Sequence, residues 1–513
     1  MPHQQVFGAT DWLAKRARFS PHRPALTIAE TGERMTYAEW NTRANRAANT
    51  LRALGVRQGE RVAVLAQNRV EYLDVLFACQ KTGAILQALN WRLTAHELRS
   101  LVRDGEPTLL LYDAANAPKA AAVLDDMPHV LGVALDEPLS GVHPQWGNML
   151  ARASSRAPTP PPRTLDDPWV LCYTGGTTGL PKAAILTYGT VTWNAVNTVS
   201  TWGLTADDTA ILNAPLFHTG GLNVFTTPLV HVGGHSIVCT GFDADQVFDF
   251  LTTGEATLFF GVPTMFIMLQ EHPRWAEASF EKTKLIISGG APCPRPVFER
   301  FFEKGVAFKT GYGLTEAGPN NFWLPPEDVQ RKVGAVGFPL MHVETRIVAD
   351  DGRDCEAGEV GELLIRGPHV IPGYWNRPDA TASTIVDGWL HTGDLAHCDE
   401  EGYTYIVGRK KDVIISGGEN IYPAEVESVM LGHPAVSEAA LIPVPDPKWG
   451  EVGRAVVVCR AGQSLSAEAL LAWLRERLAG YKVPKSVVFV DELPKTGAGK
   501  VDKQALVRRF GAP

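Results

Sequence analysis

The stretch of residues 173–182, Tyr-Thr-Gly-Gly-Thr-Thr-Gly-Leu-Pro-Lys, constrains the fold of this chain more than any other. Apolar residues at 169–173 lead into it and apolar residues at 183–186 leave it, which predicts a loop between two buried strands. Glycines let the backbone of such a loop approach a ligand closely, and its hydroxyl and N–H groups can donate to oxygen atoms. With the charge of Lys182 beside them, the loop is predicted to hold phosphate groups. A Gly/Thr-rich turn without a ligand is the alternative.

Composition narrows the class of protein. The formal net charge is −8, from 48 Lys and Arg against 56 Asp and Glu, so no basic field favours nucleic acid. The chain of 513 residues is long enough for roughly two to four units with cores of their own. Its 7 cysteines show no C-x-x-C spacing, which fits a reducing compartment. Neither a signal peptide nor a long apolar run is found, so a cytoplasmic protein without a transmembrane segment is expected.

Strand and helix patterns alternate in the first part of the chain. A helix is predicted from Thr36 to Gly55 and another over residues 71–79, and short apolar strands are predicted at 61–65, 109–112 and 130–134. Such alternation indicates parallel sheets covered by helices.

A second motif, Lys-Thr-Gly-Tyr-Gly-Leu-Thr-Glu, occupies residues 309–316. Gly311 and Gly313 flank Tyr312, so a flat ring could lie against the backbone there. Glu316 offers the carboxylate oxygens that Mg²⁺ accepts. A glycine-bracketed loop with a surface carboxylate is the alternative.

Three further segments carry candidate binding residues. His218 follows a predicted strand and precedes two glycines, and Gly290 and Ala291 lie in a Gly-rich turn after a strand, where α/β proteins tend to bind ligands. Packing alone would also explain His218, and a plain turn would explain Gly290. Asp394 could accept both hydroxyls of a ribose, and Arg409, fifteen positions later, could add a donor to the same sugar.

In this order, the motifs resemble those of adenylate-forming enzymes, which include acyl-CoA synthetases, adenylation domains of peptide synthetases and luciferases. The resemblance covers essentially the whole chain. It implies a set of ATP-binding residues that comprises Thr174, Gly175, Gly176, Thr177, Thr178, Gly179, Lys182, Gly290, Ala291, Gly311, Tyr312, Gly313, Asp394 and Arg409. It also implies catalytic roles for His218, Thr315, Glu316 and Lys500, with Glu316 as the metal ligand.

The last hundred or so residues add the remaining parts of the resemblance. Residues 494–500, Pro-Lys-Thr-Gly-Ala-Gly-Lys, resemble the family's C-terminal motif, so Lys500 is assigned as the adenylation lysine. Its ammonium group could bridge the attacking carboxylate and the α-phosphate. The resemblance makes Lys411 the hinge of a mobile domain. It further implies a set of CoA-binding residues, namely Gly417, Gly418, Glu419, Trp449, Tyr481 and Lys482.

The implied fold is α/β. A large N-terminal domain of stacked α/β sheets with a β-barrel-like part is expected over residues 1–409, and a small mobile α+β domain over residues 410–513. The tail supports this reading with a strand at 413–416, a Gly turn, and a helix beginning at Ala424. A homodimer is the oligomeric state that the resemblance suggests.

The implied activity is that of an ATP-dependent acyl-CoA ligase that uses Mg²⁺. Free CoA is expected as the thiol because no carrier domain follows Lys500. The acyl pocket is expected around His218, Gly220, Phe225 and Val262, with further walls from residues 193–197 and 320–323. These segments are mainly apolar, which favours a medium- or long-chain fatty acid.

Three alternatives remain at this point. An aryl acid of the benzoate or cinnamate type would suit the same apolar walls. A stand-alone adenylation enzyme that loads a carrier protein is less favoured. A nucleotide-binding module without catalysis is the non-enzyme alternative, against which the intact Glu316, Asp394 and Lys500 count.

Overall fold

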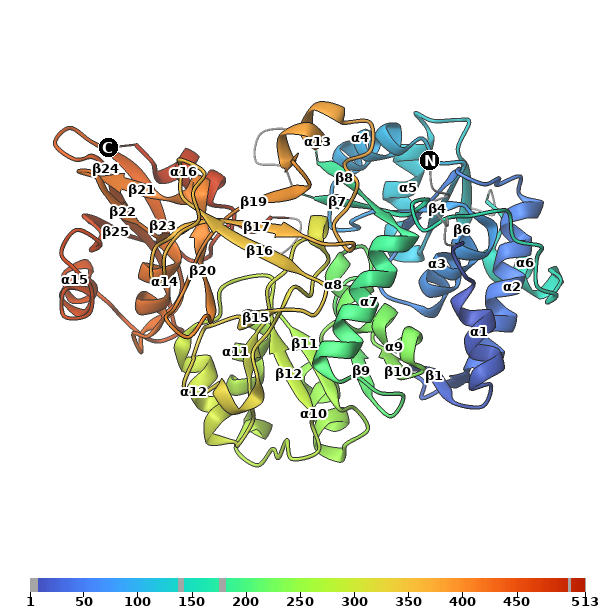
Figure 1. The fold of residues 1–513 in the computed structure, drawn as a ribbon, viewed down its shortest axis with the longest axis horizontal. Coiled ribbons are helices and arrows are strands. Elements are labelled where there is room, and N and C mark those ends of the chain that lie inside the picture. The colour runs from blue at the N-terminus through green and yellow to red at the C-terminus, as the bar shows by residue number, and fades with distance from the viewer. Residues whose placement is uncertain (1–7, 137–142, 175–180, 497–499, 513) are drawn as a thin grey trace.

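The computed structural model describes residues 8–136, 143–174, 181–496 and 500–512. Two large sheets form most of the molecule (Figure 1). The first has six strands that are parallel except for the pair β7 and β8. Their spatial order is β6 (Leu131–Ala134), β5 (Leu109–Tyr112), β3 (Arg61–Leu65), β4 (Ile85–Ala88), β7 (Pro168–Thr174) and β8 (Lys182–Thr187).

The second sheet has seven strands, of which only β1 and β2 pair antiparallel. Their order is β13 (Lys309–Thr310), β12 (Leu285–Ser288), β11 (Leu258–Gly261), β9 (Thr209–Leu212), β10 (His235–Val238), β1 (Pro24–Ile28) and β2 (Arg34–Thr36). The carboxyl ends of its parallel strands lead into the segments around His218, Gly290 and Gly311. Loops that follow parallel strands in this way are where α/β proteins place ligands.

Helices separate and cover the two sheets. They are α1 (Trp12–Phe19), α2 (Tyr37–Ala53), α3 (Val70–Thr82), α4 (Ala95–Gly105), α5 (Ala117–Leu124), α6 (Trp146–Arg152), α7 (Tyr188–Trp202), α8 (Thr219–Gly221), α9 (Thr227–Val232), α10 (Ala244–Thr253), α11 (Pro263–Glu271), α12 (Arg295–Glu303) and α13 (Pro378–Thr384). The predicted helix after Thr36 is α2, and a capping box between Thr36 and Glu39 begins it. Nearly every residue of α3 is buried, so this helix lies inside the domain, as expected of a helix that is apolar on most sides.

One core joins the two sheets. Trp169 of β7 stacks on Tyr188 of α7 with 5.3 Å between ring centroids, and its edge meets Trp12 and Phe77. The same cluster of buried side chains includes Leu212 of β9. Because the cluster contains residues of both sheets, the strand that leads into residues 175–180 is anchored in the centre of the large domain.

A third, antiparallel sheet follows in the chain. It consists of β16 (Glu344–Val348), β17 (Gly361–Arg366), β19 (Trp389–Cys398) and β18 (Ile385–Val386), with β20 (Thr404–Arg409) pairing β19. A separate two-stranded pair is formed by β14 (Phe322–Trp323) and β15 (Phe338–Pro339). In Figure 1 the third sheet lies between the two large sheets and the last part of the chain.

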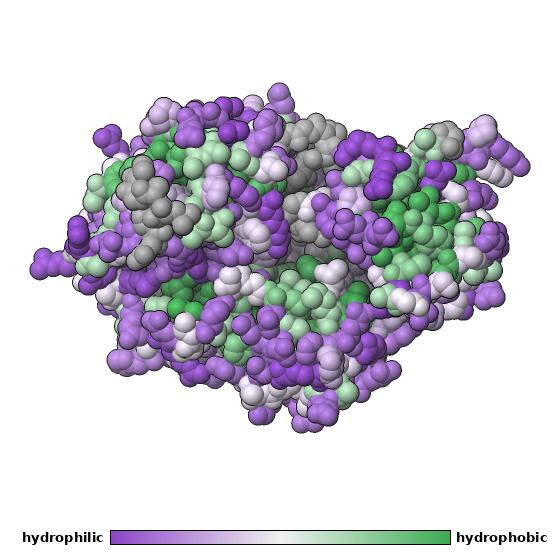
Figure 2. Space-filling view, turned by 180° about the vertical axis from the view of Figure 1, so that it is seen from behind, coloured by the Kyte–Doolittle hydropathy of each residue, from purple (hydrophilic) through white to green (hydrophobic). Residues whose placement is uncertain are grey.

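The last part of the chain, here called the C-terminal unit, has a sheet of its own. Its strands are β22 (Glu419–Ile421), β21 (Ile414–Ser416), β24 (Gly450–Cys459) and β23 (Val436–Asp446), with β25 (Ser486–Phe489) pairing β24. Its helices are α14 (Pro423–Leu431), α15 (Ala467–Arg475) and α16 (Lys503–Phe510). Two separate clusters of buried side chains pack on it, one with α14 and α15 and the other with α16. Figure 2 shows an apolar patch on the end of the molecule that this unit forms.

The predicted fold class is confirmed, and the structure corrects one element of the tail. Strand β22 was not predicted, because the Gly turn was expected to lead directly into a helix. Gly417 and Gly418 have φ angles of 62° and 91° and close a hairpin between β21 and β22. Helix α14 therefore begins only at Pro423. None of the helices among the described residues is both long enough and apolar enough to cross a membrane.

Candidate active site

The strand-loop-strand motif forms as predicted. Thr174 ends β7, Lys182 begins β8, and the two residues face each other across the hairpin. The predicted phosphate-binding residues between them, Gly175, Gly176, Thr177, Thr178 and Gly179, lie outside the described residues. The ammonium group of Lys182 lies 5.2 Å from the centre of the Tyr374 ring, a cation–π contact. Lys182 is therefore directed from the hairpin towards the segment around Tyr374.

The Tyr312 loop and the β19–β20 hairpin meet at Asp394. The Tyr312 hydroxyl donates to Asp394 Oδ2 at 2.6 Å, and Arg409 Nε lies 2.6 Å from Asp394 Oδ1. Asp394 and Arg409 are direct partners across the two strands, so the spacing of fifteen positions brings them together. Burial raises the pKa of the Asp394 carboxyl, and the positive charge of Arg409 opposes that shift. An ionised carboxylate can accept further hydrogen bonds beside these two.

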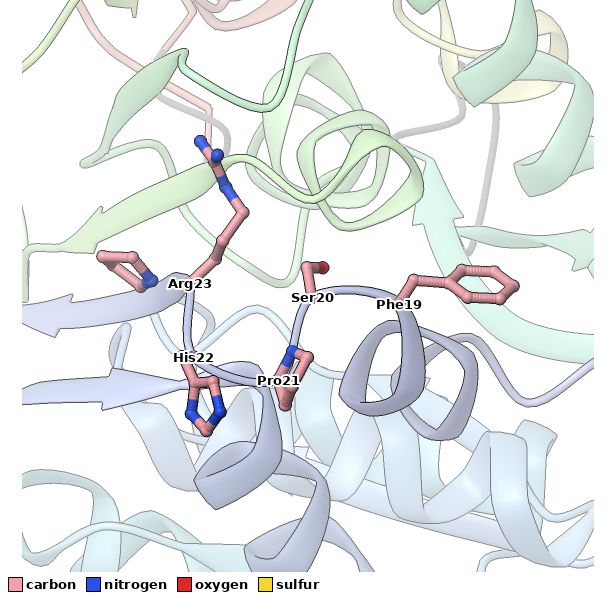
Figure 3. Close-up of a pocket in the computed structure, with 6 residues that line it drawn as sticks. Phe19, Ser20, Pro21, His22 and Arg23 are labelled. Carbon is pink, nitrogen blue, oxygen red and sulfur yellow. The ribbon is translucent and has the colours of Figure 1, made fainter.

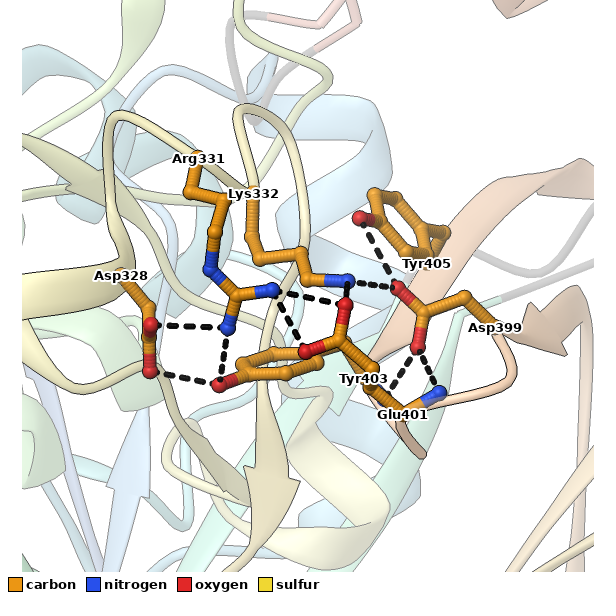
Figure 4. Close-up of polar contacts among 7 residues, drawn as sticks. All are labelled: Asp328, Arg331, Lys332, Asp399, Glu401, Tyr403 and Tyr405. Atoms are coloured by element: carbon orange, nitrogen blue, oxygen red, sulfur yellow. Dashed lines mark hydrogen bonds and ion pairs between the residues drawn. The ribbon is translucent and has the colours of Figure 1, made fainter.

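A network of ion pairs restrains the turn of the β19–β20 hairpin (Figure 4). Lys332 Nζ lies 2.6 Å from both Asp399 Oδ2 and Glu401 Oε1, and Arg331 pairs with Glu401 and Asp328. Several charges that share partners restrain a turn better than one exposed ion pair does. The network therefore holds the hairpin that carries Asp394 and Arg409.

Glu316 is positioned by a residue that the sequence did not single out. It lies in a short 3₁₀ helix, η4 (Thr315–Ala317), and its Oε1 accepts a hydrogen bond from the Tyr374 hydroxyl at 2.8 Å. Its carbonyl oxygen accepts from the Ile371 N–H at 2.9 Å. Tyr374 thus touches both Glu316 and Lys182. Local sequence spacing holds no signal for it, because the two partners of the hydrogen bond are 58 positions apart.

The Glu316 carboxylate suits Mg²⁺, an ion that substrate phosphates also bind. Among the residues that the structure describes, no three His, Cys, Asp or Glu side chains gather as metal ligands. Glu316 would therefore offer a single carboxylate, which fits Mg²⁺ because this ion is usually bound by one or two carboxylates together with substrate phosphates and water.

His218 caps the start of α8 and is half-buried. Burial lowers the pKa of its imidazole to about 4, with smaller effects in the same direction from the charges of Lys500 and Arg92. The ring is therefore neutral at pH 7. Thr315, the other predicted catalytic residue of this region, is 5% exposed. Arg92, which was not predicted, also lies 5.7 Å from the ring of Phe217.

Lys500 of the C-terminal unit reaches the same place. Burial is the main cause that lowers the pKa of its ammonium group, although the residue as a whole is exposed. Arg409 lowers the pKa further, whereas Asp394 and Glu316 raise it. The charge of Lys500 in turn lowers the pKa of His218 and opposes the rise in the pKa of Asp394. Charges from distant parts of the chain thus influence one another here.

A small cavity lies behind the glycines that follow His218. It encloses about 10 Å³, room for roughly one water molecule. Its walls are Ala210, Ile211, Leu212, Ala214, Gly220, Gly221, Val224, Phe225, Thr226 and Phe260. The ring of Phe260, which was not predicted, lies 3.3 Å from the position that a Cβ at Gly220 would take and 2.9 Å from the one at Gly289. Of the predicted acyl-pocket residues, Gly220 and Phe225 line this cavity.

The predicted residues Val262, Gly290 and Ala291 do not line this cavity. Val262 is not part of the cavity wall, but its Cγ1 lies 3.6 Å from the Cβ position of Gly290, which has a φ of 79°. Ala291 follows Gly290 in the turn after β12. A separate surface depression, lined by residues 19–24 between α1 and β1, contains none of the predicted site residues (Figure 3).

The predicted CoA-binding residues and hinge belong to or border the C-terminal unit. The Gly417 N–H donates to the Trp449 carbonyl at 2.8 Å, and Lys482 pairs with Glu425 at 2.7 Å. Glu419 is exposed, and Trp449 and Tyr481 are 41% and 39% exposed. Lys411 lies in the 3₁₀ turn η6 (Lys410–Asp412), which connects the third sheet to this unit.

Comparison with known proteins decides the family. A family model described as AMP-binding enzyme matches residues 13–375, and one described as AMP-binding enzyme C-terminal domain matches residues 425–500. The chain belongs to the AMP-binding enzyme family. The predicted membership of the adenylate-forming superfamily is thereby confirmed. The boundary between residues 409 and 410 and the roles of the individual site residues stay predictions.

Similar proteins match this chain over almost its whole length. Feruloyl-CoA synthase of an Amycolatopsis species is 44% identical over 98% of this chain and 99% of its own. Indoleacetate–CoA ligase of Aromatoleum aromaticum is 40% identical over 96% of each chain. The long-chain-fatty-acid–CoA ligase FadD13 of Mycobacterium tuberculosis is 36% identical over 98% of each chain. All three are named as acid–CoA ligases or synthases, and the prediction of an enzyme of this class is confirmed.

Solved structures share the fold of this chain. ATP-bound MatB of Rhodopseudomonas palustris is 34% identical, covers 98% of this chain and 99% of its own, and superposes with a TM-score of 0.89. The apo form of the same protein superposes with a TM-score of 0.79. The present structure is therefore more similar to the ATP-bound form.

Proposed function

We propose that this protein is an AMP-forming acid–CoA ligase whose preferred substrates are aromatic carboxylic acids. In the first half-reaction the acid and ATP give the acyl-adenylate and pyrophosphate. In the second, the thiol of CoA displaces AMP and forms the thioester. The observation that carries the proposal is the Asp394 carboxylate held between Tyr312 and Arg409, with the Glu316 carboxylate held by Tyr374.

Adenylation requires an oxygen of the substrate carboxylate to attack the α-phosphorus while the bond to the β-phosphate breaks. Positioning and charge neutralisation supply most of the catalysis of such a step. Asp394, held by Tyr312 and Arg409, would accept the ribose hydroxyls and so orient the nucleotide. The Lys500 ammonium group would stabilise the charge that develops between carboxylate and phosphate.

Glu316 would hold Mg²⁺, which neutralises charge on the phosphate oxygens when it is bound. The hydrogen bond from Tyr374 would keep the Glu316 carboxylate oriented, and Lys182 would add a positive charge from the same side. His218 is neutral at pH 7 because burial lowers its pKa to about 4. A neutral ring beside the substrate carboxylate can donate one hydrogen bond and accept another without adding charge.

The second half-reaction would need a different arrangement, because a thiol has to reach the adenylate carbonyl at the place where Lys500 would act in the first. We propose that the C-terminal unit turns about Lys411 and brings the Gly417–Glu419 hairpin to the site. Using one pocket for two steps is a physical reason for a unit that moves. Trp449, Tyr481 and Lys482 would then contact the nucleotide part of CoA.

Two observations support aromatic acids over the fatty acid that the apolar segments first suggested. The relatives named for feruloyl-CoA and indoleacetate are 44% and 40% identical, against 36% for the long-chain-fatty-acid ligase. Phe260 and Phe225 line a cavity with room for about one water molecule, so an aromatic acid would have to widen it, and its ring could then pack favourably against theirs. A medium- or long-chain fatty acid is the second candidate, which the similarity to the fatty-acid ligase favours.

The test is pyrophosphate release from Mg·ATP with a panel of acids, each with and without CoA. The panel contains cinnamate, 4-hydroxycinnamate, benzoate, indole-3-acetate, octanoate and palmitate. Strong release with the aromatic acids and weak release with the aliphatic ones would support the proposal. Release mainly with octanoate or palmitate would move the assignment to the fatty acids, and no release with any acid would contradict the ligase itself.

A further inference from the structure

Helix α7 carries a buried amide whose oxygen has no partner among the described residues. Asn194 is 2% exposed, and its Nδ2 donates to the Asn223 carbonyl at 2.8 Å. That hydrogen bond orients the amide, because only the NH₂ end can donate to a carbonyl. Oδ1 is consequently the free end, and no hydrogen bond reaches it within the described part of the chain. A buried acceptor without a partner costs about 1–3 kcal/mol, so its presence asks for an explanation.

The free oxygen lies between two walls of the proposed site. It is 2.7 Å from the position that a Cβ at Gly318 would take, and Gly318 follows Glu316 by two residues. On the other side, Asn223 belongs to the π-helical turn η2 (Leu222–Thr226), whose Val224 and Phe225 line the cavity. Asn194 thus lies where the nucleotide loop and the acyl-pocket wall come together. Single π-helical turns of this kind are frequently found at functional sites.

The side-chain amide of Asn320, which also contacts η2, has hydrogen-bond partners. Asn320 Nδ2 donates to Thr198 Oγ1 at 2.9 Å and to the Val224 carbonyl at 3.0 Å, so this side chain is used to hold η2 against α7. The NH₂ group of Asn320 therefore has hydrogen-bond partners, whereas Asn194 Oδ1 has none among the described residues. Asn194 and Asn320 come from the segments 193–197 and 320–323, which were expected to line the pocket.

We propose that Asn194 Oδ1 accepts a hydrogen bond from a hydroxyl or N–H group at the far end of the aromatic acid, so that Asn194 is a specificity-determining residue of the acyl pocket. The inference rests on the proposed function, since it needs an aromatic acid bound behind His218. A substrate that brings a donor satisfies the buried oxygen, whereas one that brings only an acceptor or an apolar group leaves it unpaired. Sites built around such a group discriminate strongly against the analogue that lacks it.

The experiment compares three acids of one shape on two proteins. 4-Hydroxycinnamate has a donor at its far end, 4-methoxycinnamate has only an acceptor there, and cinnamate has neither. We expect kcat/KM of the wild type to be at least tenfold higher for 4-hydroxycinnamate than for 4-methoxycinnamate, since 1.4 kcal/mol corresponds to a factor of ten. In Asn194→Leu, which keeps the volume and removes the acceptor, that ratio should fall to about one.

A matched control is Asn197→Leu, which removes another fully buried amide from the same helix. Asn197 Oδ1 accepts from the His342 N–H at 3.1 Å, and only its Nδ2 lacks a partner among the described residues. It therefore offers no free acceptor, and its loss should lower the rates for all three acids alike and leave their ratio unchanged. Because each ratio is measured on one preparation, it does not depend on the fraction of folded enzyme. A wild type without preference for the donor, or a preference that survives in Asn194→Leu, would overturn the inference and indicate that Oδ1 binds an internal water. Failure of all aromatic acids would instead overturn the proposed function.

Discussion

The C-terminal unit has two faces with different surroundings. One carries Lys500 and is called the Lys500 face, and the other carries the hairpin of β21 and β22 and is called the hairpin face. The Lys500 face lies against the large domain, where burial lowers the pKa of the ammonium group and Asp394 and Glu316 act on its charge. The hairpin face is exposed, with Ile415 56% and Trp449 41% accessible and with two glycines at positive φ between β21 and β22. An exposed apolar surface of this kind generally awaits a partner. The difference supports the proposal that the Lys500 face serves adenylation and the hairpin face the other half-reaction.

The largest expected effect is on the Lys500 face. Lys500→Ala should lower acid-dependent pyrophosphate release by roughly 100-fold or more, because the charge that stabilises the transition state is lost. Thioester formation from supplied acyl-adenylate and CoA should be largely kept. Lys495→Ala is the control, since Lys495 pairs with Glu438 in the C-terminal unit. Equal loss of both half-reactions would show that the Lys500 face does not serve adenylation alone.

The second prediction concerns the connection between the faces. Lys411→Pro restricts the backbone of the turn about which the C-terminal unit is proposed to move, so thioester formation should slow by roughly 10- to 100-fold. Pyrophosphate release in the absence of CoA should change far less. Lys411→Ala, which leaves the backbone free to rotate, should be close to the wild type in both assays. Unchanged overall turnover in Lys411→Pro would place the hinge elsewhere.

A smaller effect is expected on the exposed face. Gly417 has a φ of 62°, and a Cβ added there would lie 2.6 Å from the Trp449 ring. Gly417→Ala should therefore slow thioester formation by about tenfold, in line with a cost of order 1–3 kcal/mol for such strain, and leave adenylation intact. Gly418→Ala separates the two causes, because Gly418 has a φ of 91° but no atom within 4 Å of its Cβ position. If both variants are equally slow, backbone strain and not the tryptophan contact is responsible.

The smallest effect is expected at an exposed ion pair between the two units. Arg460, which follows β24, pairs with Glu271 at the end of α11. Such a pair contributes about 0.2–1 kcal/mol, so Arg460→Ala should change the ratio of the two half-reaction rates by less than about fivefold, in favour of thioester formation. A double-mutant cycle with Glu271→Ala measures the coupling. A shift towards adenylation would mean that the pair does not hold the observed arrangement.

Much of this molecule follows from local sequence. Short apolar runs predicted the strands at 61–65 and 109–112, and apolar residues at helical spacing after Thr36 predicted α2, because such patterns act within a few residues. The Asp394–Arg409 pair was also predictable, since both residues lie on one hairpin. Strand β22 was missed because it has only three residues and depends on its pairing with β21.

Tertiary structure alone decided the contacts between distant segments. Tyr374 meets Glu316, Phe260 lies between Gly220 and Gly289, and Lys500 enters a site built by the large domain. Nor does any pattern in the sequence distinguish Asn194, with its free oxygen, from Asn320, whose amide is engaged. Local interactions act along the chain and leave a periodic signal, whereas a side chain's partners across the molecule depend on how the sheets and units pack. The sequence by itself determined the elements, the family and the residue types of the site, and the packing decided which of them touch.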